Sequence, residues 1–367
     1  MMTGKENGAS IAQKPVLLYF YPLASSFVVQ DTRAFQIDYT VKVFSFLPSH
    51  KLKLPLSFIR QKLFLLRNIR SAAILVCQFA GYHSLLPVLF AKMFSKPCLV
   101  VVGGTDCVSF PEINYGNLRK PLLAWFTLKS LKWATHISAP SESLIEYEYT
   151  YQVFRYPMQG FRYYDPSIKT PCTVIYNGID TTRFIPEQGI ERKRNSFLTV
   201  VNFIDQRNYL LKGMDLFIEM ARNFPDCRFT IIGNLAPGFK VDEPSNVSFI
   251  DFIPNEMLPS KMSEYTFYCQ FSVSEGFGVS LAEAMACGCI PLVSKVGIMD
   301  SITEDSGFVL EKYDSTMLKS IISAALNSDT ESLSLKARQR VVENYSRQKR
   351  ESAFQQLMNY LVVEWHR

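Results

Sequence analysis

Two glutamates with seven residues between them flank a short glycine-containing segment in the second half of the chain. Glu275 precedes Gly276-Phe277-Gly278, and Glu283 lies in residues 279–287, whose alanine, leucine and methionine content is typical of a helix. Glycines let a backbone approach a ligand closely, and the free N–H groups of a helix's first turn attract a phosphate or diphosphate. Carboxylates repel phosphate, so their natural partners are neutral hydroxyls. The spacing therefore indicates a site for a diphosphate with a sugar on either side.

A glycine loop between a strand and a helix is also common in α/β proteins, and a glutamate on a helix is usually only solvated. An ordinary structural role is thus the alternative for the loop taken alone. The whole string is more specific: Glu275, seven residues, Glu283, then Ala284-Met285-Ala286-Cys287-Gly288 and Ile290-Pro291-Leu292-Val293. It resembles the signature of the family 4 retaining glycosyltransferases of GT-B architecture.

The resemblance implies an α/β protein with two Rossmann-like domains, each a doubly wound parallel sheet, facing each other across a cleft. We expect an acceptor-binding domain over residues 1–185 and a nucleotide-sugar-binding domain over residues 186–345. The string Ile175-Tyr176-Asn177-Gly178-Ile179-Asp180 marks the passage between such domains in the family. In relatives the last helix, here about residues 346–367, crosses back to the first domain.

The resemblance also implies roles for residues of the second domain. In the family, a lysine before a glycine contacts the donor phosphates, and Lys212 is at that position here. An arginine usually stands five or six residues before this lysine, which corresponds to Arg207. Alignment from the preceding strand places Phe203 at that position instead. Glu283 would hold the ribose hydroxyls. Glu275 would hold hydroxyls of the transferred sugar or, less favoured, act as a nucleophile. The remaining charge on the departing diphosphate would be stabilised by backbone amides, namely those of Gly276, Phe277, Gly278 and Val279.

A second glycine turn, Gly103-Gly104-Thr105-Asp106, follows an apolar, strand-like run in the first half. Ligands of doubly wound sheets bind beyond the carboxyl ends of the strands. We therefore expect Gly103 and Gly104 to leave room for a sugar in the cleft. Asp106 could accept the acceptor's proton, with binding or turn structure as the alternative. Many family members carry a histidine near this point and this sequence does not. His83 is a weaker cleft candidate.

The first half is basic. Between Asp38 and Asp106 there are nine lysines and arginines and no acidic residue. Residues 57–70 mix apolar and basic side chains at helical spacing, which predicts a basic amphipathic helix. Such a helix docks on an anionic membrane or is simply solvated. We therefore expect a glycan or lipid-linked acceptor, in cell-surface polysaccharide or lipopolysaccharide synthesis, and no nucleic-acid partner.

Composition limits the remaining possibilities. The 367 residues are 48% hydrophobic, enough for two full cores. No apolar run reaches the ~18–20 residues of a membrane span, and the polar leader is no signal peptide. We expect a cytoplasmic protein, either free or peripheral at the inner face of a membrane. The eight cysteines are scattered and no metal-ligand set is visible, so we expect transfer without metal or cofactor, with the nucleotide sugar as substrate.

Two alternatives share the expected fold: a nucleotide-sugar epimerase, which needs no acceptor, and a non-catalytic, membrane-docked scaffold. The joint presence of Glu275, Glu283 and Lys212 favours an active transferase. The shape of the pockets determines which UDP- or GDP-sugar is the donor and what the acceptor is, and the motifs do not specify that shape.

Residues 141–149 are predicted to form a capped helix.

Overall fold

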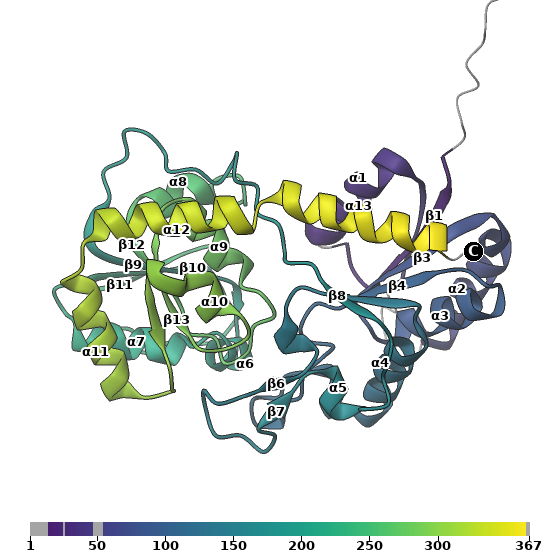
Figure 1. The fold of residues 1–367 in the computed structure, drawn as a ribbon. Helices are drawn as coiled ribbons and strands as arrows, with labels where there is room; N and C mark the ends of the chain where they lie inside the picture. Colours follow the sequence, from purple (N-terminus) through teal and green to yellow (C-terminus); the bar gives the residue numbers. More distant parts are fainter. Residues whose placement is uncertain (1–13, 25, 47–53, 365–367) are drawn as a thin grey trace, which may run out of the picture.

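Two parallel six-stranded sheets with helices packed against them form the computed structural model, which describes residues 14–24, 26–46 and 54–364 (Figure 1). The first sheet has the order β2 (Thr40–Ser45), β1 (Val16–Tyr21), β3 (Ala72–Gln78), β4 (Cys98–Val101), β5 (His136–Ala139), β8 (Cys172–Val174). The second has the order β11 (Val247–Ile250), β10 (Arg228–Leu235), β9 (Lys193–Ile204), β12 (Tyr265–Gln270), β13 (Ile290–Ser294), β14 (Phe308–Leu310). The predicted fold class, two Rossmann-like domains with parallel sheets, is confirmed.

The helices follow the alternation expected of a doubly wound fold. They are α1 (Ser26–Asp38), α2 (Leu54–Asn68), α3 (Tyr82–Met93), α4 (Pro121–Trp133), α5 (Phe161–Tyr164), α6 (Gln206–Leu211), α7 (Met214–Asn223), α8 (Leu258–Ser263), α9 (Val279–Ala286), α10 (Met299–Thr303), α11 (Ser315–Leu326), α12 (Thr330–Asn344) and α13 (Arg347–Glu364). None of those in the described part of the chain combines the length and apolarity needed for a bilayer crossing.

The central strands are buried on both faces, as parallel strands are. All six residues of β12 are buried, and the ring of Phe197 on β9 stacks between Phe229 and Phe267, with both centroid distances 4.9 Å. In the first sheet β2 and β3 lie on opposite sides of β1, and in the second β10 and β12 lie on opposite sides of β9. These are the points where the strand order reverses, and ligands of such sheets bind at the carboxyl ends there.

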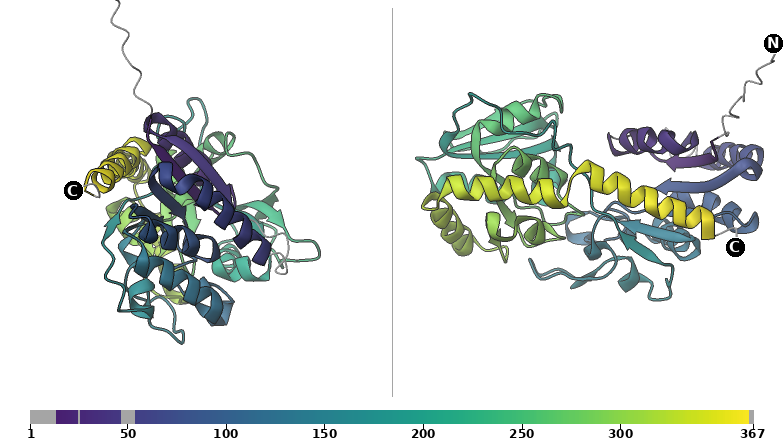
Figure 2. Two further views of the ribbon diagram at one scale, coloured as in Figure 1. Left: turned by 90° about the vertical axis from the view of Figure 1, so that its right-hand side faces the viewer. Right: turned by 45° about the horizontal axis from the view of Figure 1, so that its top comes forward.

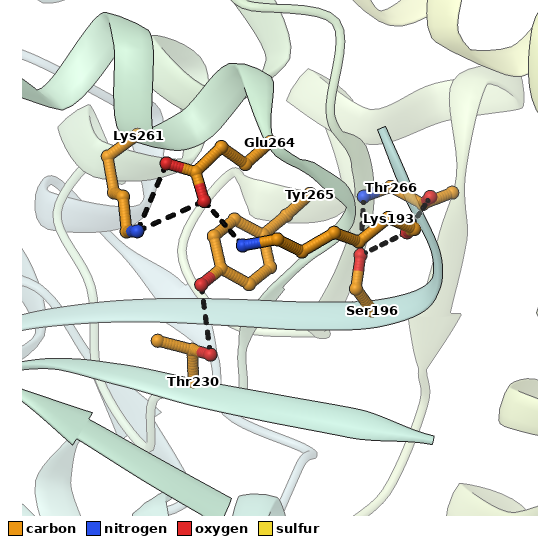
Figure 3. A network of polar contacts seen from close by, with 7 residues as sticks. All are labelled: Lys193, Ser196, Thr230, Lys261, Glu264, Tyr265 and Thr266. Atoms are coloured by element: carbon orange, nitrogen blue, oxygen red, sulfur yellow. Dashed lines mark hydrogen bonds and ion pairs between the residues drawn. The ribbon is translucent and has the colours of Figure 1, made fainter. Parts of the chain in front are cut away.

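A polar network holds β9 against β12 at the opposite, amino-terminal ends of these strands (Figure 3). Lys193 donates to Glu264 at 2.5 Å, and its ammonium lies 4.9 Å from the ring centre of Tyr265. The Tyr265 hydroxyl donates to Thr230 at 3.0 Å, and Lys261 also pairs with Glu264 at 3.0 Å. This network fixes the two strands whose far ends form the cavity described below.

The chain crosses between the domains twice, and the crossings lie side by side. The N–H of Ile179 donates to Tyr345 O, and the N–H of Arg347 donates to Ile179 O, both at 2.8 Å. A Cβ on Gly178 would lie 2.7 Å from the Cα of Arg347, so the close approach requires glycine. From there α13 runs back along the first domain (Figures 1 and 2), where Phe354 and Met358 join its apolar core.

The helix predicted for residues 141–149 is wrong. Residues 142–144 make a single 3₁₀ turn, and β6 (Tyr147–Glu148) then pairs antiparallel with β7 (Met158–Gln159). Contacts with the second domain account for the extended conformation. The hydroxyl of Tyr149 donates to Val273 O at 2.9 Å, and that of Tyr147 donates to Lys295 O at 3.3 Å. The two domains are thus in direct contact.

Candidate functional site

A cavity of about 200 Å³ lies at the carboxyl ends of β9 and β12, where the order of the second sheet reverses. We call it the second-domain cavity. Its walls come from β9, from the end of β12, from the loop after it and from the first turn of α9, with Gly103 and Asn177 of the first domain closing one side. The strand–glycine–helix segment predicted from residues 265–287 therefore does line a cavity at the domain boundary.

Lys212 and Glu275 form an ion pair inside this cavity. The Lys212 Nζ lies 2.8 Å from Glu275 Oε2, and the Gln270 amide donates to the same oxygen at 3.0 Å. The two charged side chains are 33% and 18% exposed. Burial alone would lower the pKa of Lys212, but the neighbouring Glu275 carboxylate and Tyr115 raise it above its usual value. The ammonium is therefore fully charged at neutral pH and available to an anion.

The amino terminus of α9 supplies donors to the same cavity. Gly278 has φ +94° and precedes the helix, and Val279 and Ser280 of its first turn line the cavity. The first N–H groups of a helix have no partner within it and carry part of its positive dipole. Lys212 and these amides are donors of the kind that bind phosphate, although Glu275 balances the lysine charge in this structure.

Two buried polar atoms of the lining have no hydrogen-bond partner in the described part of the chain. They are Gln270 Oε1 and Ser272 Oγ. Leaving such groups unpaired costs about 1–3 kcal/mol each. Their residues line the cavity beside Glu275, but the two atoms themselves are covered by protein.

Glu283 lies one turn further along α9 and is not part of the cavity lining. Burial raises the pKa of Glu283 to about 7, although a hydrogen bond with Asn255 and the charge of Arg183 act to lower it. Arg183 in turn donates to Asn255. Glu283 thus sits in a polar cluster beside the cavity and is poised to change its charge near neutral pH.

Arg207 is a further candidate that lies outside the cavity lining. It is exposed on α6 and is not among the lining residues; Phe203, the alternative of the sequence alignment, is 41% exposed and does not line the cavity either. Asp205 caps α6 by accepting from the Asn208 N–H at 2.7 Å. The helix start is thus fixed locally, and Arg207 is exposed in the first turn.

A second, larger cavity of about 430 Å³ occupies the equivalent position in the first domain. We call it the first-domain cavity. Pro22 follows β1 and Phe79 follows β3, so the cavity lies where the first sheet reverses its order. Its walls are mainly apolar, with His83, Thr105 and Asn117 among the polar members. Gly103 lines both cavities, so they meet at that residue.

The two glycine loops touch across the domain boundary. A Cβ on Gly276 would lie 2.7 Å from the carbonyl oxygen of Gly103, and one on Gly104 would lie 3.7 Å from the backbone of Gly276. A side chain at Gly276 would therefore push the two loops apart, whereas Gly104 is in ordinary contact. Gly103, Gly104 and Gly276 are thus brought together as the sequence suggested, and Phe277 and Gly278 line the cavity next to them.

Asp106 is buried under these loops and its carboxylate is occupied. Oδ1 accepts from the N–H groups of Gly103 and Gly104, each at 3.0 Å, and Oδ2 accepts from Ala80 at 2.9 Å. Burial raises the pKa of Asp106 even though these hydrogen bonds lower it. The geometry favours the second of the two roles considered for Asp106, that of holding the ends of β3 and β4 in place.

His83 lines the first-domain cavity as a neutral ring. Its Nε2 lies 2.8 Å from the carbonyl oxygen of Gln78, and because a carbonyl only accepts, this nitrogen carries the proton. Burial lowers the pKa of His83 to about 4. The imidazole is therefore uncharged at neutral pH.

Tyr115 is a cleft residue that the motifs did not select. Its hydroxyl lies 3.1 Å from Thr105 Oγ1, and paired backbone hydrogen bonds with Phe110 hold it in place. Burial raises the pKa of Tyr115, and the charges of Lys212 and Glu275 also act on it across the domain boundary. A neutral hydroxyl therefore lies beside Thr105 of the first-domain cavity and within reach of the charges of Lys212 and Glu275. In the sequence, the only sign of this role was that Tyr115 belongs to a loop that follows the second glycine turn.

Within the described ranges no group of three His, Cys, Asp or Glu side chains is placed to hold a metal ion. The described chemistry consists of the helix amides, a lysine and its carboxylate partner. It suits a phosphorylated ligand that also carries hydroxyl groups.

Comparison with known proteins finds similarity to glycosyltransferases. Residues 181–348 match the family model described as glycosyl transferases group 1. The chain is 28% identical over 174 residues to an uncharacterized glycosyltransferase of Methanocaldococcus jannaschii, covering 45% of this chain and 46% of that protein. It is 27% identical over 136 residues to the phosphatidylinositol N-acetylglucosaminyltransferase gpi3 subunit of Schizosaccharomyces pombe, covering 34% and 29%. The chain thus matches less than half the length of these curated relatives.

Solved structures of the same fold cover nearly the whole chain. Sucrose-phosphate synthase from Thermosynechococcus elongatus superimposes with a TM-score of 0.72 at 15% identity, covering 96% of this chain and 100% of that one. Anabaena HepE in complex with UDP gives 0.68 at 13% identity, covering 94% and 99%. At such low identity the likeness concerns the fold, which is the GT-B fold.

Proposed function

We propose that this chain, whose residues 181–348 match the family model of glycosyl transferases group 1, is a retaining glycosyltransferase that uses a nucleotide-sugar donor. The observation that carries the proposal is the Lys212–Glu275 pair at the amino terminus of α9. The ammonium and the helix amides can donate hydrogen bonds to a diphosphate, and the carboxylate can accept hydrogen bonds from the hydroxyls of a sugar. HepE, of the same fold, is complexed with UDP, which supports a UDP-sugar as the first donor to test.

In the proposed complex Lys212 turns from Glu275 to the diphosphate, and the amides of Gly278 and Val279 bind the same phosphates. Glu275 is then free to accept from hydroxyls of the transferred sugar, together with Gln270. Glu283 accepts from the ribose hydroxyls. The contact between the glycine loops excludes water that would otherwise hydrolyse the donor.

Transfer in this proposal occurs on one face of the sugar. The bond between the anomeric carbon and the phosphate oxygen breaks, and the acceptor oxygen bonds to the same face of that carbon. The acceptor proton passes to the leaving phosphate oxygen, so no protein base is required. This is compatible with Asp106, whose carboxylate is already bonded to three backbone N–H groups. Lys212 stabilises the charge that develops on the diphosphate, and no metal is needed for that step.

We further propose a lipid-linked acceptor presented at an anionic membrane. On α2 the side chains of Leu56, Ile59, Leu63 and Leu66 are 54%, 56%, 47% and 51% exposed at helical spacing. The exposed bases around them are Arg60, Lys62, Arg67 and Arg70. Each base near an anionic surface contributes on the order of 1 kcal/mol to docking. Apolar side chains among the bases would enter the interface.

The exposed apolar surface continues to the first-domain cavity. Phe58 of α2 stacks on Phe126 of α4 with centroids 5.7 Å apart, and Phe58 also contacts Phe46 at 5.2 Å. Phe46 lines the cavity. On α4, Trp125 is 48% exposed beside this contact. In this proposal the enzyme works in the cytoplasm, at the inner face of a membrane, with the acceptor entering from that side.

Thermal unfolding with a panel of nucleotides tests the donor site. A nucleotide at about 100 times its dissociation constant stabilises the protein by about 2.7 kcal/mol. UDP or GDP should stabilise the wild type and the Lys319→Ala control, which removes an exposed lysine on α11, but not Lys212→Ala. No stabilisation by any nucleotide would favour the scaffold alternative. Release of an isomeric nucleotide sugar without acceptor would favour the epimerase.

Vesicle sedimentation tests the membrane surface. Vesicles of phosphatidylglycerol and phosphatidylcholine at low salt should bind the wild type and release it as salt rises. Leu63→Asp should abolish binding, whereas Leu335→Asp, at a 66% exposed position on α12, should not. Equal binding by the two variants would refute the docking surface while leaving the donor site untouched.

A further inference from the structure

Phe79, which follows β3, has a backbone conformation that bulky residues avoid. Its φ is +67°, in the left-handed region where a side chain crowds its own backbone. A hydrogen bond of 2.7 Å from its N–H to Val101 O holds this turn. Strained residues of this kind persist where the surrounding structure fixes them, and they cluster at functional sites.

Packing in the core does not explain the strain. Phe79 is only partly buried, whereas its neighbours Gln78 and Ala80 are 4% and 2% exposed. Phe79 lines the first-domain cavity together with Pro22, where the order of the first sheet reverses. The strained turn thus places an aromatic residue where such a sheet binds its ligand.

Gly103 is required beneath this ring. A Cβ there would lie 2.2 Å from Phe79 Cε1 and 2.5 Å from Cδ1, so any side chain would displace the ring. Gly103 also lines the second-domain cavity. The Phe79 ring therefore lies beside the point where the two cavities meet.

The other groups of this cavity define the ligand. Thr105, Asn117 and His83 place hydrogen-bonding atoms around a mainly apolar space of about 430 Å³. An aromatic face with a few polar groups at its edge matches a pyranose ring, which has an apolar C–H face and hydroxyls around its rim. We propose that Phe79 is the platform for the acceptor sugar that receives the transferred residue. This inference rests on the proposed transferase function and adds to it a positioning residue and the chemical class of the acceptor group.

Saturation-transfer NMR tests the platform without knowledge of the natural acceptor. The probes are methyl glycosides of glucose, galactose, mannose and N-acetylglucosamine, with octyl β-D-glucopyranoside below its micelle concentration. We expect saturation of the ring protons of at least one methyl glycoside, lowered at least ~5-fold in Phe79→Leu and in Gly103→Ala. Phe252→Leu, which removes a 53% exposed ring of the second domain, should keep the signal.

Two results would overturn the inference: no ring saturation from any probe, or the same ring saturation in Phe79→Leu. Saturation of the octyl chain alone would likewise show that the cavity takes lipid rather than sugar. Nucleotide stabilisation, measured on the same samples, separates these failures from failure of the proposed function, because it should remain in Phe79→Leu.

The backbone argument has its own test. Glycine adopts φ +67° without the strain that a Cβ imposes, so Phe79→Gly should have a higher melting temperature than Phe79→Ala, and both should lose the ring-proton signal. If alanine is as stable as glycine at this position, the conformation is not strained and the argument fails.

Discussion

The pKa of Glu283 leads to a prediction about how stability depends on pH. Burial raises this pKa from 4.5 to about 7. Between these values the folded protein holds a proton on Glu283 that the unfolded chain has lost, so the contribution of Glu283 to stability falls as pH rises from 4.5 to 7. The two values differ by about 2.5 pH units, which corresponds to about 3 kcal/mol above pH 7.

Glu283→Gln removes this titration and keeps the shape of the side chain. We expect the stability of the variant relative to the wild type to increase by about 2–3 kcal/mol between pH 5 and pH 8. For a domain of this size that is roughly 4–12 °C in melting temperature. Taking the difference between the proteins cancels all other titrating groups. Differential scanning calorimetry at several pH values makes the measurement, and a difference that does not change with pH would refute the reasoning.

The same carboxyl should make nucleotide binding depend on pH. If the ionised form of Glu283 accepts from the ribose hydroxyls, binding is coupled to loss of its proton. The affinity for UDP or GDP should therefore rise from pH 6 to pH 8 in the wild type and stay flat in Glu283→Gln. Titration calorimetry in buffers of different ionisation enthalpy would detect the released proton. A wild-type affinity that is independent of pH would exclude Glu283 from the ribose site.

Three further predictions concern the contacts around the cleft. Glu275→Gln frees Lys212 from its charged partner. UDP should then bind about 10-fold tighter, corresponding to ~1.5 kcal/mol, while sugar transfer falls. An unchanged UDP affinity in titration calorimetry would contradict this role of the ion pair. Gly276→Ala places a Cβ 2.7 Å from Gly103 O and should separate the two loops. The rate of sugar transfer should fall ~100-fold, while nucleotide binding is retained. A normal rate of transfer would show that the loops need not touch. Tyr149→Phe loses the hydrogen bond to Val273 O and should destabilise the closed arrangement by about 1 kcal/mol, seen as a more expanded particle in X-ray scattering, whereas an unchanged profile would show that other contacts suffice.

Local pattern was enough to predict part of the site. The apolar run before Glu275, the two glycines and the helix-forming residues after them are adjacent in sequence, and each acts on its own stretch of backbone. The lysine–glycine pair at Lys212 starts a helix in the same way. Such features survive in any fold that places the segment at the end of a parallel strand, which is why the strand, loop and helix were correctly predicted.

Long-range contacts decided the rest. Lys212 and Glu275 are 63 residues apart in sequence, and their ion pair exists because β9 and β12 are neighbours in the sheet. The carboxylate of Asp106 is occupied by N–H groups from two different loops, which no spacing rule reveals. Arg207 fits the motif, yet the capped start of α6 directs it to solvent.

The sequence by itself determined the alternation of strands and helices and the strand–glycine–helix segment around Glu275, because periodicity, glycine placement and helix propensity act over a few residues. Only the tertiary structure decided the strained turn of Phe79, the meeting of two cavities at Gly103 and the protonation of Glu283. These depend on burial and on which segments come into contact. Both are properties of the packed domains, since desolvation and steric fit arise only when distant parts of the chain meet.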